Sequence, residues 1–218
     1  MISKANIEQF SNLETPFYFY DIKLLRETIS EVSQLAQRHD FHIHYAIKAN
    51  SNRRILTELQ LSGFGADCVS GNEVKLADEV GFSSEKILFA GVGKTDKEIN
   101  AALDLNIKAF NCESAQEIEV LNDLARNKGK IAEISIRINP NVDAKTHKYI
   151  TTGLDENKFG INQAELPKLI AILPALKNVK LTGLHFHIGS QITDMNVFKG
   201  LCLRVNEIQS WFLDQGIE

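Results

Sequence analysis

The sequence predicts an α/β fold with a mainly parallel sheet. Short β-rich runs alternate with amphipathic stretches along 218 residues, and Gly, Ser or Asn residues close the runs. From residue 42 onward six such pairs follow without a low-complexity linker or a change in composition. Six right-handed βα units fit an open doubly wound sheet or an unfinished barrel, and a complete (β/α)8 barrel needs about 250 residues. We therefore expect one domain over residues 1–218 that is truncated after about six βα units.

The expected elements follow from this alternation. Strands are expected at residues 15–21, 42–49, 65–70, 86–92, 108–114, 132–142 and 179–191. Helices are expected at residues 24–38, 53–61, 72–81, 96–105, 115–129, 164–176 and 197–216. The chain ends directly after the last of these helices, where a seventh barrel strand is expected to begin. We interpret the sequence as part of a longer protein.

Composition excludes several classes of function. A chain with 44% hydrophobic and 24% charged residues is a soluble globular protein with a sizeable core. The net charge of -4, without a Lys/Arg-rich run, argues against a nucleic-acid partner. The sequence has neither the zones of a signal peptide nor an apolar run near the roughly 20 residues that span a bilayer. We expect a cytoplasmic protein with no membrane contact.

The cysteines indicate neither a disulfide framework nor a zinc knuckle. They are three in number, widely spaced, and never in C-x-x-C form. No metal is expected from them.

Polar residues gather at the carboxyl ends of three expected strands, where α/β folds carry their chemistry. Period-two alternation places alternate residues of a strand on one face. This rule groups His42, His44, Ala46 and Lys48 on one strand, Ser135, Arg137 and Asn139 on another, and His185, His187 and Gly189 on a third. In the stretch "FHIHYAIKANSN", this alternation therefore places Lys48 on the inward face, at the rim of the sheet.

Lys48 is the candidate nucleophile. A half-buried lysine beside histidines is desolvated, which lowers its pKa and frees its amine to attack a carbonyl and form a Schiff base. The alternative is a solvated lysine at a strand end, which is the commoner case for a lone lysine. The three polar strand ends favour the first interpretation.

Several blocks in a fixed order carry a family resemblance. "HYAIKAN", "GADCVSGNE", "RINPNV", "NKFGI" and "HFHIGSQ" resemble the fold-type III pyridoxal-phosphate decarboxylases, from residue 15 to the end. The resemblance implies a TIM-type (β/α)8 barrel of the alanine racemase-like kind and a pyridoxal-phosphate cofactor. It also implies decarboxylation of meso-diaminopimelate to L-lysine, because "THKYITTG" favours this small amino-acid substrate over ornithine. Ornithine, arginine and carboxynorspermidine are the alternative substrates.

The same resemblance implies the site residues. Lys48 would hold pyridoxal phosphate and transfer protons, and His187 would stack on its ring. Ser190 would contact the phosphate, with Gly189 allowing close approach of the backbone. Asp67 would orient the lysine amine, and Arg137 would lie near the cofactor.

Three of these residues also have a structural interpretation. His187 could be a hydrogen-bonded core histidine, Asp67 could fix a turn, and Arg137 could form a buried ion pair. Glu73 is expected to cap its helix or face solvent. His147 and Lys158 are expected to be solvated, although "KFG" is a strong part of the resemblance.

Parts of the family pattern are missing from the sequence. These are the glycine-rich phosphate loop, a Glu-Pro-Gly-Arg segment, and the Cys and Tyr residues of a carboxyl-terminal β domain. Because that domain completes the site across a homodimer in the family, we expect the 218 residues alone to be inactive.

Four rival interpretations compete with this one. A P-loop around "GKT" fails because Leu88 stands where a glycine is required. Alanine racemases follow their lysine with "ANAYG", whereas "ANSNRR" follows here. A non-catalytic decarboxylase homologue is disfavoured by Lys48, His187 and Ser190. A metal hydrolase would use the H-x-H pairs His42, His44, His185 and His187.

Overall fold

A six-stranded parallel sheet forms the centre of the computed structural model, which describes residues 4–140 and 159–217. The strands are β1 (His44–Ala46), β2 (Gly65–Cys68), β3 (Ile87–Phe89), β4 (Ala109–Cys112), β5 (Ala132–Arg137) and β6 (Val179–His185). They lie in sequence order, each hydrogen-bonded to the next. All five pairings are parallel. This confirms the predicted α/β fold, and the consecutive order is that of a barrel rather than a doubly wound sheet.

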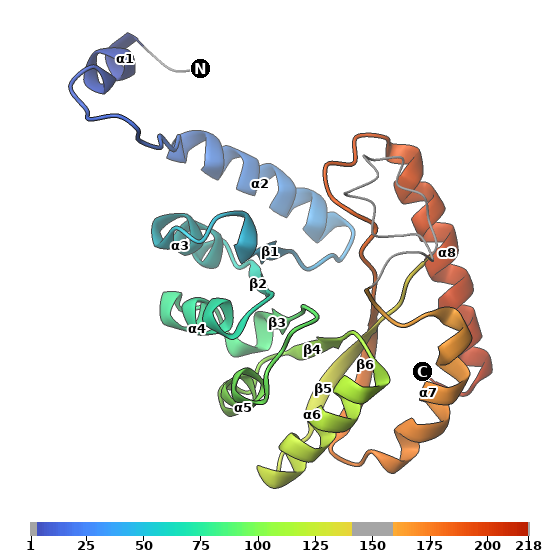
Figure 1. Ribbon diagram of the computed structural model, residues 1–218. Coiled ribbons are helices and arrows are strands. Elements are labelled where there is room, and N and C mark those ends of the chain that lie inside the picture. The colour runs from blue at the N-terminus through green and yellow to red at the C-terminus, as the bar shows by residue number, and fades with distance from the viewer. Residues whose placement is uncertain (1–3, 141–158, 218) are drawn as a thin grey trace. The chain divides into compact units, whose positions relative to one another are not determined.

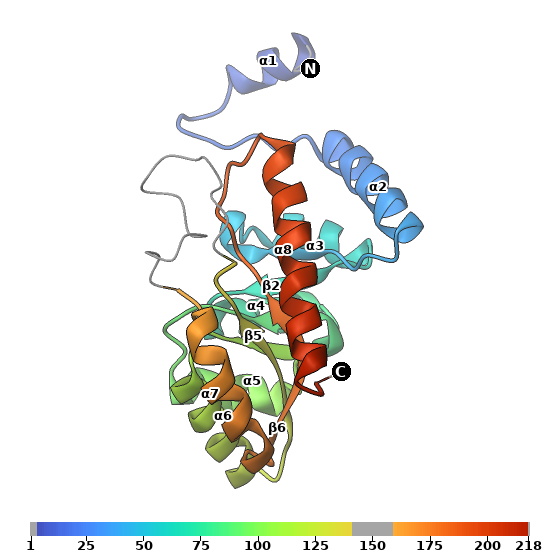
Figure 2. The same ribbon diagram turned by 90° about the vertical axis from the view of Figure 1, so that its right-hand side faces the viewer.

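Helices connect the strands and follow the last of them. The connecting helices are α3 (Arg53–Leu61), α4 (Gly71–Val80), α5 (Asp96–Leu105), α6 (Ala115–Asn127) and α7 (Leu166–Ile172), and α8 (Met195–Asp214) follows β6. Helices α3 to α6 follow one another along one side of the sheet (Figure 1). Helices α7 and α8 lie beside each other (Figure 1, Figure 2), joined where Arg204 Nη2 donates to Gln163 Oε1 at 2.6 Å. None of the described helices is long and apolar enough to cross a bilayer.

The two faces of the sheet differ in burial because side chains alternate along each strand. Phe89, Phe110 and Ile134 are paired across three neighbouring strands, and each is at most 2% exposed. This row packs under the helices, and the Phe89 and Phe110 ring centroids lie 6.1 Å apart. The opposite face, called here the inner face, carries Asn111 and Ser135, which are also register partners. Polar groups therefore line the inner face toward the carboxyl ends of the strands.

Three successive helices begin with the same capping pattern. A Ser or Thr side chain accepts the backbone N–H of a Glu three residues later, which satisfies a donor that the first turn leaves unpaired. The pairs are Ser70 with Glu73 in α4, Thr95 with Glu98 in α5, and Ser114 with Glu117 in α6. The prediction that Glu73 caps its helix is confirmed, because its carboxylate also accepts the N–H of Val69 at 2.7 Å.

The chain divides into two compact units, residues 1–42 and 43–218, and the sheet belongs to the second. The first unit contains α1 (Lys4–Phe10) and α2 (Ile22–Arg38), which the Asp21 side chain caps at Leu24 N. The prediction of one barrel domain over residues 1–218 stays a prediction.

The strand expected at residues 15–21 is wrong, because no strand is assigned to these residues. The alternation behind it is real: the rings of Phe17 and Phe19 pack on Phe10, with centroids 5.3 and 4.9 Å away, while Tyr18 is 89% exposed. A period of two sorts side chains between two faces. It does not supply the neighbouring strand that a β-ladder needs.

Gly65 marks the tightest approach between β1 and its neighbours. A Cβ added there would lie 2.3 Å from the His44 ring and 2.5 Å from the backbone oxygen of Lys86. We expect Gly65→Ala to lower the free energy of unfolding by about 1–3 kcal/mol, the usual cost of overpacking. Gly93→Ala is the matched control, since nothing lies within 4 Å of its added Cβ. Urea unfolding of both variants measures this, and equal stabilities would contradict it.

Candidate active site

The register of the strands brings the predicted residues to one edge of the inner face. Paired residues of a parallel sheet point to the same side, so Ala46 and Asp67 share a face, and so do Arg137 and His185. Lys48 lies two residues beyond Ala46. The charges of Lys48 and Arg137 both act on Asp67 and on His187. The structure therefore gathers Lys48, Asp67, Arg137 and His187 at the carboxyl ends of β1, β2, β5 and β6.

Lys48 differs from expectation in its burial. It lies in a 3-10 turn, Ile47–Ala49, that directly follows β1, and its side chain is exposed although Ile47 is fully buried. The expected half-buried lysine is therefore wrong for this structure. The strand ends at Ala46, so the lysine stands at the rim, where fewer neighbours cover it.

Asp67 is an acid in a partly buried position on β2. Burial raises its pKa, the Glu73 carboxylate raises it further, and the cations Lys48 and Arg137 offset this only in part. The carboxyl group therefore holds a proton to higher pH than an exposed aspartate does. The predicted role of Asp67 in orienting the lysine amine stays a prediction.

Arg137 forms a buried ion pair with Glu113 at the end of β4. Its Nη1 lies 2.6 Å from Oε1 and 2.9 Å from Oε2 of Glu113, and both residues are 8% exposed. The structural interpretation of Arg137 is thus confirmed. Contact between Arg137 and a cofactor stays a prediction, and the two roles are compatible.

The described end of the "KFG" block packs on Arg137. The Phe159 ring centroid lies 5.6 Å from the guanidinium carbon, within the range of a cation–π contact. Gly160 has a φ of +87°, and a Cβ there would lie 3.1 Å from the Arg137 carbonyl oxygen, so glycine fits both the conformation and the space. His147 and Lys158 lie outside the described residues.

The two histidines of β6 and its extension favour the neutral form. Burial is the main cause that lowers the pKa of His185 to about 3, with contributions from Arg137, His187, Lys94 and Lys48. Burial also lowers the pKa of His187, followed by Arg137 and Lys48. Nδ1 of His185 is buried without a hydrogen-bond partner. Beyond them, Gly189 has a φ of +122° and Ser190 is exposed.

Residues 23–213 match the family of pyridoxal-dependent decarboxylases, in its pyridoxal-binding domain. The chain belongs to this family.

Relatives in the family agree with the match. A diaminopimelate decarboxylase of Bacteroides thetaiotaomicron is 53% identical over 204 residues, which are 93% of this chain and 53% of that protein. The chain spans about half the length of the curated relatives it matches.

Solved structures share the fold. That of Helicobacter pylori diaminopimelate decarboxylase, complexed with L-lysine, has a TM-score of 0.87 at 40% identity and covers 97% of this chain and 54% of that one. The diaminopimelate decarboxylase from M. jannaschii, in co-complex with L-lysine, has a TM-score of 0.90 at 35% identity and covers 97% and 51%. These neighbours confirm the predicted barrel fold, of which this chain carries part.

The residues present fit the pyridoxal phosphate that names the decarboxylase family. The cofactor is an aldehyde on a flat ring with an anionic phosphate. An exposed amine (Lys48) is complementary to the aldehyde, and an imidazole whose lowered pKa favours the neutral form (His187) is complementary to the ring. The Arg137 guanidinium places positive charge near an anionic ligand. The unpartnered Nδ1 of His185 shows that a buried polar atom is left for a ligand group to satisfy.

The rival metal site would need several ligand side chains close together. Among the residues that the structure describes, no three His, Cys, Asp or Glu side chains converge as metal ligands.

Sequence reasoning missed Glu113, Lys94 and Glu117. Lys94 was considered only as the lysine of a failed P-loop. The available signal was the "ESAQE" stretch, because a Glu at a strand end followed by a Ser-x-x-Glu cap places two carboxylates near one helix start.

Glu113→Gln is expected to lower the free energy of unfolding by about 3–5 kcal/mol, because it leaves the buried Arg137 cation without its counter-charge. Asp123→Asn is the matched control. It breaks the Arg126–Asp123 pair of 3.1 Å, whose side chains are 61% and 59% exposed. It should lower the free energy of unfolding by at most about 1 kcal/mol. Urea unfolding compares the two, and equal losses would contradict the prediction.

His185 should make the fold sensitive to acid. Its pKa falls from 6.5 to about 3 on folding, so the unfolded chain binds the proton more readily. The stability that neutral His185 contributes is therefore fully present above pH 6.5 and is lost as the pH falls toward 3. We expect His185→Gln to remove about 2 kcal/mol of the stability loss between pH 7 and pH 5. Denaturant unfolding across this range measures it, and parallel pH profiles for the two proteins would contradict it.

Proposed function

We propose that the chain is the pyridoxal-binding part of a carboxy-lyase that converts meso-diaminopimelate to L-lysine. The observation that carries this proposal is the convergence of Lys48, Asp67, Arg137 and His187 at one edge of the sheet. The names of the relatives support the substrate, since they are called diaminopimelate decarboxylase at 35–53% identity. When bound, pyridoxal phosphate supplies an electron sink for the carbanion left by departing carbon dioxide.

The proposal gives each residue a task. Lys48 binds the cofactor aldehyde through its amine and later moves a proton. Its exposed position at the end of β1 leaves the amine open to an incoming carbonyl. Asp67 orients that amine, and the neighbouring charge of Lys48 acts on its carboxyl group.

The remaining residues hold the ring and the phosphate. His187 stacks on the ring as a neutral imidazole, which a lowered pKa favours. Arg137 supplies positive charge beside the ring. Gly189 and Ser190 contact the phosphate, with the positive φ of Gly189 exposing backbone there.

The proposal extends to the whole protein. We infer a homodimer of a longer polypeptide, acting in the cytoplasm, with the 218 residues alone inactive. Three free cysteines, Cys68, Cys112 and Cys202, suit a reducing compartment.

Attachment of the cofactor tests the proposal. The chain is mixed with pyridoxal phosphate, its absorbance is recorded, borohydride is added, and the labelled peptide is identified by mass spectrometry. We expect label on Lys48 and none in Lys48→Ala. Lys97→Ala, which removes an exposed lysine on α5, is the control and should label as the unsubstituted chain does.

The substrate is tested on the longer polypeptide. Release of carbon dioxide from meso-diaminopimelate should exceed that from ornithine, arginine and carboxynorspermidine. A preference for one of these would replace the substrate but keep the reaction class. In the labelling experiment, label on another lysine with Lys48 unlabelled would contradict the assignment of the site.

A further inference from the structure

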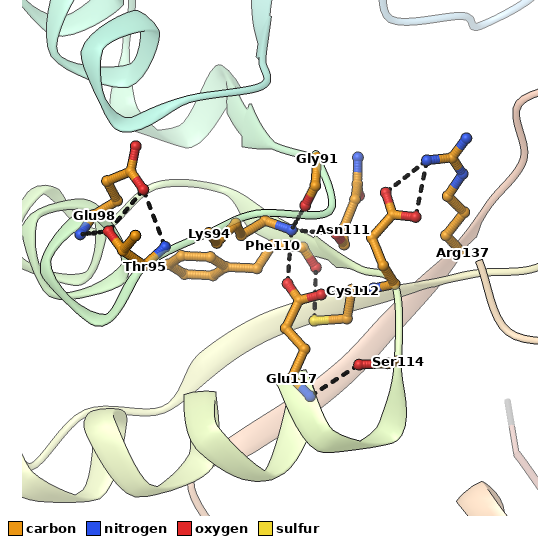
Figure 3. Close-up of polar contacts among 11 residues, drawn as sticks. Gly91, Lys94, Thr95, Glu98, Phe110, Asn111, Cys112, Ser114, Glu117 and Arg137 are labelled. Atoms are coloured by element: carbon orange, nitrogen blue, oxygen red, sulfur yellow. Dashed lines mark hydrogen bonds and ion pairs between the residues drawn. The ribbon is translucent and has the colours of Figure 1, made fainter. Parts of the chain in front are cut away.

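A buried lysine lies outside the residues assigned above. Lys94 is in the turn between β3 and α5, and its side chain is 1% exposed. Its Nζ donates to Gly91 O at 2.8 Å, to Asn111 O at 2.8 Å and to Glu117 Oε1 at 2.6 Å (Figure 3). An ammonium has three protons, and three acceptors receive them. Buried lysines are rare, so this position requires a reason.

Glu117 links Lys94 to the residue that follows β4. While Oε1 binds Lys94, Oε2 accepts the backbone N–H of Glu113 at 2.8 Å. Glu113 in turn holds Nη1 of Arg137 with both carboxylate oxygens. A continuous series of hydrogen bonds therefore runs from the turn after β3, across the end of β4, to Arg137 on β5.

The position of Arg137 depends on the residues before it in this series of hydrogen bonds. Arg137 lies beside the histidines and Asp67, whose pKa values its charge lowers. Its guanidinium is placed by the Glu113 carboxylate, and the Glu113 backbone is held by Glu117. Glu117 is only 15% exposed, so without Lys94 its carboxylate would lack a counter-charge and would turn toward water.

We propose that Lys94 and Glu117 are positioning residues, which fix Glu113 so that it holds Arg137 in the cofactor site. This deepens the proposed function and rests on it, because it assumes that Arg137 contacts the cofactor. Lys94 and Glu117 need not touch the cofactor themselves.

The first test needs no cofactor. In the full chain, hydrogen exchange of the Glu113 amide and the Nε–H signal of Arg137 are followed by NMR. We expect Lys94→Met to speed Glu113 exchange about tenfold, as loss of a charge-assisted hydrogen bond implies, and to shift the Arg137 signal. If Lys94→Met fails to fold, Lys94→Met with Glu117→Gln removes both charges together. Unchanged exchange and an unchanged Arg137 signal would overturn the proposal.

The second test measures the dissociation constant of pyridoxal phosphate in a double-mutant cycle. Lys94→Met should weaken binding about tenfold in the unsubstituted chain and have little effect in the Arg137→Gln background, since it acts through Arg137. An equal loss in both backgrounds would overturn the proposal and indicate a general structural effect.

Glu98→Ala is the matched control for this cycle. Glu98 also caps a helix, and its carboxylate accepts Gly71 N at 2.8 Å together with Thr95 N and Thr95 Oγ1, so within the described part of the chain its bonds go to α4 and its own cap and not to Glu113. It should lower stability and leave cofactor affinity unchanged. If the unsubstituted chain binds no pyridoxal phosphate, the proposed function fails, and the NMR result alone decides whether Lys94 positions Arg137.

Discussion

The parallel pairing of the strands, with one register shift between β5 and β6 at Ile134/Ser135, is the constraint on which the candidate site depends. Neighbouring strands run the same way, so their carboxyl ends open at one edge, and residues far apart in sequence meet there. Lys48 and His187 are separated by most of the chain, yet the charge of the lysine acts on the imidazole. A slip of one residue would turn these side chains to the helix-covered face.

Burial and nearby cations together determine the chemical state of this edge. Burial is the largest cause of the lowered pKa of His185, and the charges of Arg137, Lys94 and Lys48 act in the same direction. The pKa of the Asp67 carboxyl shifts the other way, because burial and Glu73 outweigh the cations Lys48 and Arg137. The result is an edge where imidazoles favour the neutral form and an acid keeps its proton to higher pH than an exposed aspartate does. Such a surface suits a ligand that is flat and carries negative charge.

Much of this could be predicted from alternation. The rule that places Ser135 with Arg137, and His185 with His187, needs only a period of two, and the register agrees with it. The burial of Lys48 could not be predicted, because it depends on where the strand stops and a 3-10 turn begins. The prediction of a strand at residues 15–21 was wrong for a related reason, since alternation of side chains does not show whether a neighbouring strand is present for pairing. Lys94 was missed because burial of a lysine depends on acceptors from distant segments, here Gly91, Asn111 and Glu117.

The repeated caps of α4, α5 and α6 have a consequence for how the site can change. Glu98 of α5 also binds the Gly71 N–H of α4, and Glu117 of α6 binds Lys94 just before α5, so each helix start is fastened to its neighbour. A substitution in one of these turns therefore disturbs the start of the neighbouring helix as well as its own. We expect paired substitutions across two neighbouring turns to be tolerated better than either single substitution.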